Sequence, residues 1–396
     1  MTSSLTPETI EFIRTHQQED VKKLALQTKH HPHVDMPAAL TQIAGRQIAA
    51  TKLPTWYAVD GIVYPPHLSM EQCSSELTAR YKAALVSGDS LADLTGGFGI
   101  DCSFLAEQFK QVDYVERQEI LCEIANHNFP LLGLNQIRVN HADGVEFLQQ
   151  LSQTDCIFLD PARRDKNGGK TVSVADCEPD AGALEPLLLT KARQVLLKLS
   201  PMLDISLALQ ALPHTTAVHI VSVSNECKET LLMLGPEVPQ HIPIYCANLT
   251  NERQDVFQFD REEEAEAVCS YTCEVGRYLY EPNASLLKAG AYRILAQRFN
   301  LNKLHPNSHL YTSDQLAADF PGRIFETTGT CSLNKKELKS ALGELPKANL
   351  TVRNFPASVA ELRKRIKLKE GGDTYIFATT LADETKKLII CKKYNA

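Results

Sequence analysis

A glycine-rich segment at 93–99 (Asp-Leu-Thr-Gly-Gly-Phe-Gly) has the residue types and spacing best suited to binding a small molecule. Glycine lets the backbone turn sharply and approach a ligand closely, and the first N–H groups of a following helix face that ligand. A dinucleotide fingerprint would need a third glycine at position 102, where the chain has Cys102, so NAD is disfavoured. A second segment, 168–171 (Gly-Gly-Lys-Thr), is not a P-loop, because the required first glycine would fall at Arg164.

Three acidic residues are spaced to complete a nucleoside site around this loop. Asp93 lies in the loop, Glu116 ends the next predicted strand, and Asp143 follows the strand after that. Acids at the carboxyl ends of consecutive strands line the crevice in which open α/β sheets bind ligands. S-adenosylmethionine needs close backbone approach at its methionine end, a carboxylate for its ribose and a polar partner for its adenine. The pattern therefore predicts this cofactor, while the alternative is that Glu116 and Asp143 only cap the helices that follow them.

A fourth acid, Asp160, ends the buried run 156–160 and is followed by Pro161. Proline ends the strand and rigidifies the turn, so the carboxylate would be held at the sheet edge, beside the place of a sulfonium methyl group. We expect Asp160 to orient the methyl acceptor or to take its proton. Arg163 and Arg164 could grip a phosphate or a guanine edge with their planar guanidinium groups, or could pair with a neighbouring aspartate.

The elements that would position these residues alternate between strands and helices from residue 90 onward. Such short apolar strands separated by helices predict an α/β fold whose parallel sheet is covered on both faces. The predicted strands are 90–94, 112–116, 137–141, 156–160, 195–200 and 218–223, with 242–249 and 256–259 at the sheet edge, and the predicted helices are 100–109, 119–132 and 203–212. Thr6 and Pro7 predict the start of an N-terminal helix, and a capping box at Ser358 predicts another near the C-terminus.

Composition and charge narrow the class of protein further. The 396 residues carry a net charge of −7, but residues 345–396 hold 11 Lys/Arg against 5 Asp/Glu, so this segment is +6 and the rest is −13. A basic segment of this kind favours a polyanion such as RNA as a binding partner, although a solvated lysine-rich surface would have the same composition.

Eleven cysteines without a Cys-x-x-Cys pair, together with an N-terminus that lacks signal-peptide character, predict a reduced, cytoplasmic protein without structural zinc or disulfides. No apolar stretch is long enough to cross a membrane, and the histidines at 30–33 favour a loop over a metal site.

The sequence resembles class I (Rossmann-like) S-adenosylmethionine-dependent methyltransferases in four stretches: LADLTGGFG, YVERQ, NHADG and FLDPARR. The resemblance is closer to bacterial methyltransferase-like proteins with a THUMP-like C-terminal domain, through MEQCSSELTARYKA at 70–83, DLTGGFGID, DPARRD, YLYEPNASLLKAG at 278–290 and RNFPASVAELRKR at 353–365. The resemblance implies cofactor-binding roles for Ser75, Asp93, Thr95, Gly96, Gly97, Phe98, Gly99, Glu116, Arg117, Asp143 and Gly144, and catalytic roles for Asp160, Pro161, Arg163 and Arg164.

The same resemblance implies the domain organisation and the substrate class. It implies an N-terminal helical region at 1–70, a Rossmann-like domain at 71–262, a small connecting domain at 270–325 for which a ferredoxin-like fold is one option, and a THUMP-like α+β domain at 326–396. THUMP domains are associated with RNA modification, so the expected activity is methylation of a tRNA or rRNA base. A methyltransferase of proteins or small molecules and a non-catalytic RNA-binding protein are the alternatives, and the oligomeric state stays open.

Two departures from better-known relatives bear on the target atom. Amino-group methyltransferases carry Asp/Asn-Pro-Pro-Tyr/Phe, whereas this chain has Ala162 and Arg163 at the last two positions. The missing aromatic residue disfavours an exocyclic amine as the acceptor. No Pro-Cys pair follows the strand, which disfavours a covalent mechanism at pyrimidine C5.

Overall fold

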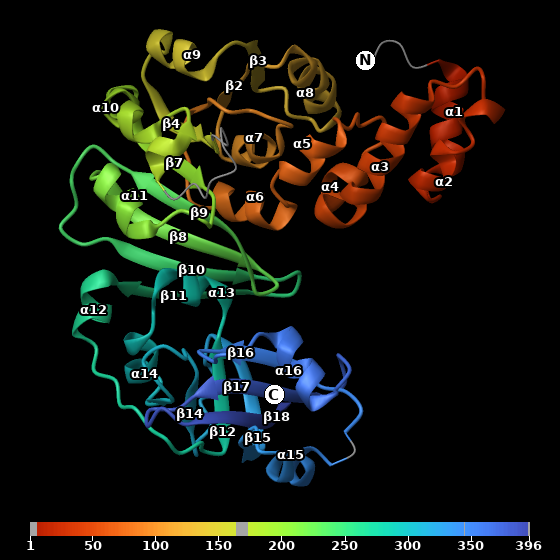
Figure 1. Cartoon of the computed structure of the whole chain (residues 1–396). Coiled ribbons are helices and arrows are strands. Elements are labelled where there is room, and N and C mark those ends of the chain that lie inside the picture. The colour runs from red at the N-terminus through yellow and green to blue at the C-terminus, as the bar shows by residue number, and fades with distance from the viewer. Residues whose placement is uncertain (1–5, 164–172, 344, 395–396) are drawn as a thin grey trace. The chain divides into compact units, whose positions relative to one another are not determined.

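The computed structural model describes residues 6–163, 173–343 and 345–394. Contacts divide the chain into two compact units, one formed by residues 1–218 with 229–240 and the other by 219–228 with 241–396. The colours of Figure 1 follow the chain through its helices and strands. Within the described residues, no helix is both long and apolar enough to span a membrane.

A nine-stranded sheet carries the predicted strands, in the order β11-β10-β8-β9-β7-β4-β1-β2-β3. The strands β3, β2, β1, β4 and β7 run parallel to one another. The bounds are β1 Ser90–Asp93, β2 Gln111–Glu116, β3 Ile137–His141, β4 Thr154–Leu159, β7 Ala192–Leu199, β8 Thr215–Val223, β9 Glu226–Leu234, β10 Pro243–Leu249 and β11 Gln254–Asp260. The predicted α/β class is confirmed, and β10 and β11 lie at the sheet edge as expected.

The parallel strands expected from the sequence are accompanied by antiparallel ones, namely β10 with β11 and, between β8 and β7, the strand β9, which the sequence pattern did not reveal. This strand pairs antiparallel with β7. It follows β8 after only two residues, Ser224 and Asn225, whose φ angles of 49° and 66° are both positive. Two consecutive positive φ angles are typical of the tight hairpin turn that sequence usually marks with Asn-Gly, and this chain has Ser-Asn instead.

In the chain, the helices α1 to α6 precede the sheet, and the helices α7 to α11 alternate with its strands (Figure 1). Their bounds are α1 Pro7–His16, α2 Val21–Ala25, α3 Met36–Lys52, α4 Pro54–Tyr57, α5 His67–Gln72, α6 Glu76–Ala83, α7 Ile100–Leu105, α8 Glu119–Leu131, α9 Gly144–Gln150, α10 Ala181–Lys191 and α11 Ile205–Ala211. Thr6 caps α1 as predicted. The helix α10 was not predicted, because Pro186 lies inside it and its apolar residues do not gather on one face.

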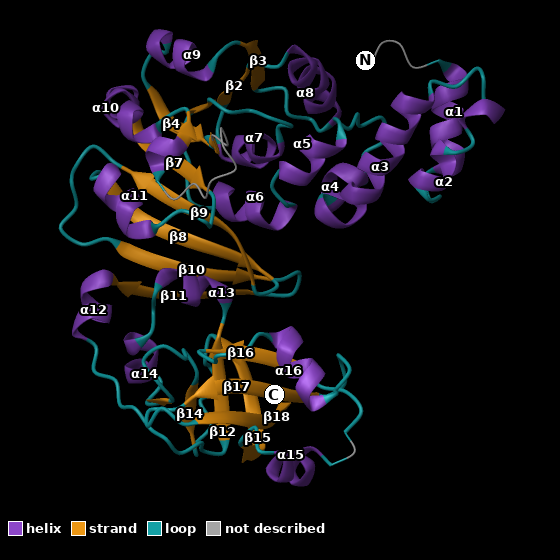
Figure 2. Cartoon of the chain, in the orientation of Figure 1, coloured by secondary structure: helices purple, strands orange, loops and turns teal. Residues whose placement is uncertain are grey.

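The second unit contains a seven-stranded sheet in the order β13-β14-β12-β15-β18-β17-β16, drawn as strands in Figure 2. Its elements are α12 Arg261–Glu266, β12 Tyr278–Pro282, α13 Ala284–Ala289, α14 Arg293–Arg298, β13 Asn302–Lys303, β14 Tyr311–Ser313, β15 Gly322–Cys331, α15 Lys335–Leu342, β16 Asn349–Arg353, α16 Val359–Ile366, β17 Thr374–Thr380 and β18 Lys386–Lys393. Side chains alternate across the sheet, so Ile376 packs with Leu362 of α16 on one face while Phe377 packs with Phe325 on the other. Ser358 caps α16 in the predicted capping box.

Candidate active site

The glycine loop between β1 and α7 is pressed against β2. A Cβ atom at Gly96 would lie 2.2 Å from the ring of Tyr114, so only glycine fits there. Gly97 and Gly99 have φ angles of 55° and 86°, in the left-handed region that glycine adopts without steric cost. The Tyr114 hydroxyl donates to the Gly97 carbonyl at 2.6 Å. The loop is therefore fixed by its glycines and by one tyrosine, as the sequence predicts for a ligand-binding turn.

Glu116, at the end of β2, is joined directly to this loop. Its carboxylate accepts from the Gly97 N–H at 2.9 Å and from the Gln118 N–H at 2.8 Å. A carboxylate has about four lone-pair positions, so two remain for other donors. A vicinal diol such as that of ribose supplies two donors. Glu116 thus combines a structural role with the acceptor capacity expected of a ribose-binding residue.

Asp143 and Gly144 lie beside the start of the same loop. A Cβ at Gly144 would lie 2.3 Å from the Leu94 carbonyl oxygen, so the backbones touch here. The Asp143 Oδ1 caps α9 by accepting from the N–H groups of Val145 and Glu146. The capping alternative for Asp143 is therefore realised. The residue is nevertheless exposed, and Oδ2 has no hydrogen-bond partner among the described residues.

Asp93 is the most deeply buried acid of the group, since the residue is only 1% exposed. Its Oδ1 accepts from the Thr95 N–H at 3.0 Å, while Oδ2 has no partner within the described part of the chain. Burial, together with the negative charges of Asp101, Asp160 and Glu116, raises the pKa of Asp93 to about 8. An unpartnered oxygen of a buried acid is expensive unless a ligand supplies a donor or a positive charge.

Asp160 follows β4 and is held at its backbone by the glycine loop. Its N–H donates to the Thr95 hydroxyl at 2.7 Å, and Pro161 after it is buried. The side chain is 35% exposed and forms an ion pair with Lys198 of β7. The following residues, Ala162–Arg163, form the short strand β5, which pairs with β6, Cys177–Glu178. Arg164 lies outside the described residues.

Hydrogen bonds and backbone contact thus bring Asp93, Glu116, Asp143 and Asp160 to one turn at the sheet edge. Three other predicted site residues have different contacts. The Phe98 ring is buried against Trp56, with ring centroids 5.0 Å apart. Ser75 caps α6 by accepting from the Thr78 N–H at 3.3 Å. Arg117 is mostly exposed and pairs with Glu178 at 3.4 Å.

A buried cluster of charges behind Asp160 was not recognised from the sequence. Lys82 of α6 donates to both carboxylate oxygens of Glu229, at 2.8 and 2.7 Å, and to the Ser74 hydroxyl at 3.1 Å. The same ammonium lies 3.1 Å from Asp101, which in turn lies 3.7 Å from Lys198. The only local signal was a lysine inside an otherwise buried helix face, next to Ala79 and Ala83.

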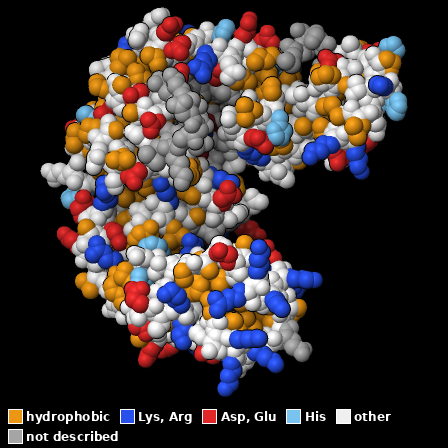
Figure 3. All heavy atoms as spheres, in the orientation of Figure 1, with side chains coloured by type: hydrophobic (Ala, Val, Ile, Leu, Met, Phe, Trp, Pro, Cys, Tyr) orange, Lys and Arg blue, Asp and Glu red, His pale blue; other side chains and the backbone are white. Residues whose placement is uncertain are grey.

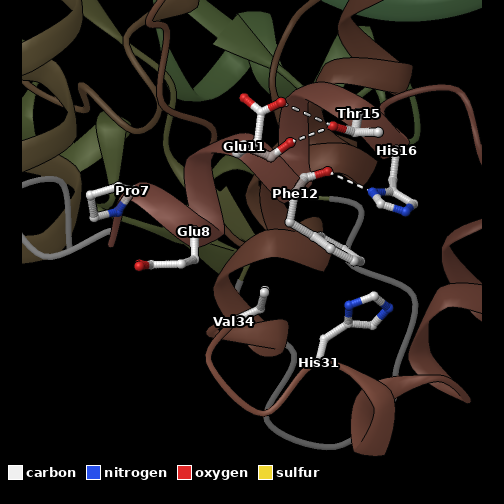
Figure 4. A pocket seen from close by; sticks show the side chains of 8 residues that line it. All are labelled: Pro7, Glu8, Glu11, Phe12, Thr15, His16, His31 and Val34. Atoms are coloured by element: carbon white, nitrogen blue, oxygen red, sulfur yellow. Dashed lines mark hydrogen bonds between the residues drawn. The ribbon is translucent and has the colours of Figure 1, made fainter.

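Within the part of the chain that the structure describes, no group of three His, Cys, Asp or Glu side chains is arranged to hold a metal ion. His31 contacts Phe12 and, with His16, lines an open pocket on α1 (Figure 4). This pocket includes none of the residues predicted for the cofactor or for catalysis.

Comparison with known proteins identifies the family. Residues 278–321 match the family described as a ferredoxin-like domain, and residues 322–393 match the THUMP domain-like family. The crystal structure of a protein from Porphyromonas gingivalis W83 assigned as a methyltransferase is 35% identical, covers 97% of both chains and has a TM-score of 0.86. An uncharacterized S-adenosylmethionine-dependent methyltransferase of Mycobacterium tuberculosis, found in strains CDC 1551 and H37Rv, is 23% identical over 307 residues, or 76% of this chain and 80% of that protein.

The match to the Porphyromonas gingivalis protein extends over nearly the full length of both chains. This chain belongs to the family of S-adenosylmethionine-dependent methyltransferases with a THUMP-like C-terminal domain.

Proposed function

We propose that this protein transfers a methyl group from S-adenosylmethionine to RNA. The observation that carries the proposal is the meeting of four acids at one glycine turn: Gly97 bonds Glu116, Gly144 touches Leu94, and Thr95 bonds both Asp93 and Asp160. Open α/β sheets bind ligands at this edge, outside the carboxyl ends of their strands.

The residues at the turn fit the cofactor group by group. The two spare lone-pair positions of Glu116 match the ribose diol. Oδ2 of Asp143 can accept from the adenine amine, and the unpartnered Oδ2 of Asp93 suits the positively charged amino group of the methionine end. The glycines leave room for the backbone to lie close to that end. When bound, S-adenosylmethionine supplies a methyl group already activated by its sulfonium centre.

The protein's part in the transfer is mainly to position the acceptor. Asp160 has its backbone fixed by Thr95 and its carboxylate partly open to solvent. The Asp160 carboxylate can accept a hydrogen bond from the substrate atom that receives the methyl group and so align that atom. Alternatively, it can take the proton of that atom as the bond to the methyl group forms. Arg163 and Arg164 follow directly and are proposed to contact the phosphates or base of the substrate.

RNA is the favoured substrate because of the C-terminal unit. Residues 322–393 match the THUMP domain-like family, and the last 52 residues carry the excess of positive charge. Lys and Arg side chains gather on this unit in the face that Figure 3 shows, and Lys364, Arg365 and Lys367 at the end of α16 are exposed. A nucleobase target must come from a loop, an end or a flipped position to reach Asp160.

The test is methyl transfer from labelled S-adenosylmethionine by the full chain. Total RNA and protein extract are offered separately as acceptors, with Asp160→Asn as the active-site variant. Asp20→Asn is the matched control, because Asp20 caps α2 and asparagine caps a helix equally well. We expect label in RNA, a loss of about 100-fold or more in Asp160→Asn, and no change in the control.

Two outcomes would contradict the proposal. Label in protein alone would indicate the alternative substrate class. Binding of RNA without any methyl transfer, at an affinity that Asp160→Asn does not change and that falls with salt, would indicate a non-catalytic RNA-binding protein.

A further inference from the structure

Five charged side chains of the first unit form a row that leads from the protein interior to Asp160. Glu229 of β9 bonds Lys82 of α6, Lys82 pairs with Asp101 of α7, Asp101 pairs with Lys198 of β7, and Lys198 pairs with Asp160. Negative and positive groups alternate along the row. Its inner member Lys82 is fully buried, and its outer end, Asp160, is the open one.

Such a row is expensive to bury unless each charge has its partners. Lys82 and Lys198 lower the pKa of Asp101, although its burial alone would raise it. Burial alone would lower the pKa of Lys198, but the negative charges of Asp160, Asp101 and Glu229 raise it above its ordinary value. Asp101 and Lys198 are therefore charged at neutral pH, and Lys198 presents a fixed cation to Asp160.

Asp160 has two separate anchors, one for its backbone and one for its side chain. The Thr95 hydroxyl accepts from the Asp160 N–H and so fixes the main chain. The Lys198 ammonium bonds Oδ2 and so fixes the carboxylate. The structure gives Oδ1 no partner among the described residues, so this oxygen is available to another donor.

We propose that Lys198 is a positioning residue for methyl transfer, which bonds Oδ2 of Asp160 and thereby directs Oδ1 toward the acceptor atom. Asp101, Lys82 and Glu229 hold the Lys198 ammonium in place from the interior. This inference rests on the proposed function, since it gives Asp160 the role described above. Lys198 acts through Asp160 and needs no contact with the substrate.

A double-mutant cycle tests this arrangement, with methyl transfer to RNA as the first readout. The proteins are the parent, Lys198→Met, Asp160→Asn and the double variant. We expect Lys198→Met to lower kcat by about 10- to 100-fold, as loss of an orienting partner typically does, with KM for S-adenosylmethionine unchanged within about twofold. In the Asp160→Asn background the same substitution should change kcat by less than about twofold, because its target is gone.

Two further variants separate positioning from general damage. Lys198→Arg keeps a cation with donors and should recover most of the lost kcat. Lys191→Met is the matched control, since Lys191 precedes the same strand and, among the described residues, donates to the carbonyl oxygens of Gln149 and Leu151. This control should transfer methyl groups like the parent. If Lys198→Met does not fold, the cycle is run with Lys198→Gln, which should lower kcat in the parent background and leave it nearly unchanged in the Asp160→Asn background.

Unfolding by urea gives a readout that does not depend on activity. Lys198→Met should lower the midpoint in the parent background more than in the Asp160→Asn background, because only the parent contains the ion pair between Lys198 and Asp160, whereas the pair between Lys198 and Asp101 is present in both. Equal effects of Lys198→Met on kcat in both backgrounds would overturn the inference and leave the role of Asp160 intact. A parent protein without methyl transfer would overturn the proposed function itself, and the inference with it.

Discussion

Replacement of Asp93 by asparagine tests whether the acid in the glycine turn is neutral in the folded protein. The pKa of Asp93 is raised to about 8, mainly by burial and also by the neighbouring carboxylates, from 3.8. Between these two values the folded protein keeps a proton that the unfolded chain has released. The folded state therefore binds more protons, and its stability falls as pH rises. Asparagine resembles the protonated acid and does not titrate.

The size of the expected change in stability follows from the thermodynamic linkage between protonation of Asp93 and folding. Stability should fall by about 1.4 kcal/mol for each pH unit between pH 5 and 7, where Asp93 is protonated only in the folded state. The free energy of unfolding of Asp93→Asn, relative to the parent, should therefore increase by about 3 kcal/mol between pH 5 and pH 7. The asparagine can still accept from the Thr95 N–H through its side-chain oxygen.

The assay is urea unfolding at pH 5, 6 and 7, followed by tryptophan fluorescence. Trp56 is the single tryptophan, is buried against Phe98 and belongs to the same unit as Asp93, so its emission reports on the relevant unfolding step. Asp155→Asn is the control. The Arg193 side chain, with the Asp89 and Ser90 N–H groups, lowers the pKa of Asp155 to about 2, so its difference from the parent should be constant over this range. A constant difference for Asp93→Asn as well would refute the reasoning.

Two further predictions concern the packing around the site. Gly96→Ala should destabilise the first unit by about 1 to 3 kcal/mol, because the new Cβ would lie 2.2 Å from the Tyr114 ring. The control Gly329→Ala, whose Cβ would have no atom within 4 Å, should change the free energy of unfolding by less than about 1 kcal/mol. Urea unfolding measures both variants. Lys82→Met should lower the free energy of unfolding by about 3 to 5 kcal/mol in the same assay, because it leaves the buried Glu229 without its positively charged partner. A decrease of less than about 1 kcal/mol would contradict the buried ion pair.

The local elements of both units were largely predictable where each carries its own sequence pattern. The strand 137–141 was predicted with the bounds that β3 has, and the capping box at Ser358 located α16. In contrast, β9 depends on a turn whose Ser-Asn sequence is not distinctive, and α10 has apolar residues on every side. Apolar periodicity identifies a helix only when one face of the helix is apolar and the opposite face is polar.

The parts of the candidate site that lie in short local motifs could be predicted from the sequence. Contacts between side chains that are far apart in the sequence could not. The glycine loop and the strand-end acids follow from the order of the elements, which places them at one sheet edge. Lys82 and Glu229 are 147 residues apart, so no local pattern could pair them. Phe98 and Ser75 lie in motifs that resemble the cofactor site, yet their side chains pack against Trp56 and cap α6.

The most direct test of the central claim is calorimetric titration of the full chain with S-adenosylhomocysteine. The parent should bind one molecule per chain. Glu116→Gln should bind at least about tenfold more weakly, since a hydrogen bond to a charged group contributes about 1.5 to 3 kcal/mol. The absence of binding to the parent, or equal affinity for both proteins, would contradict the assignment of this sheet edge as the cofactor site.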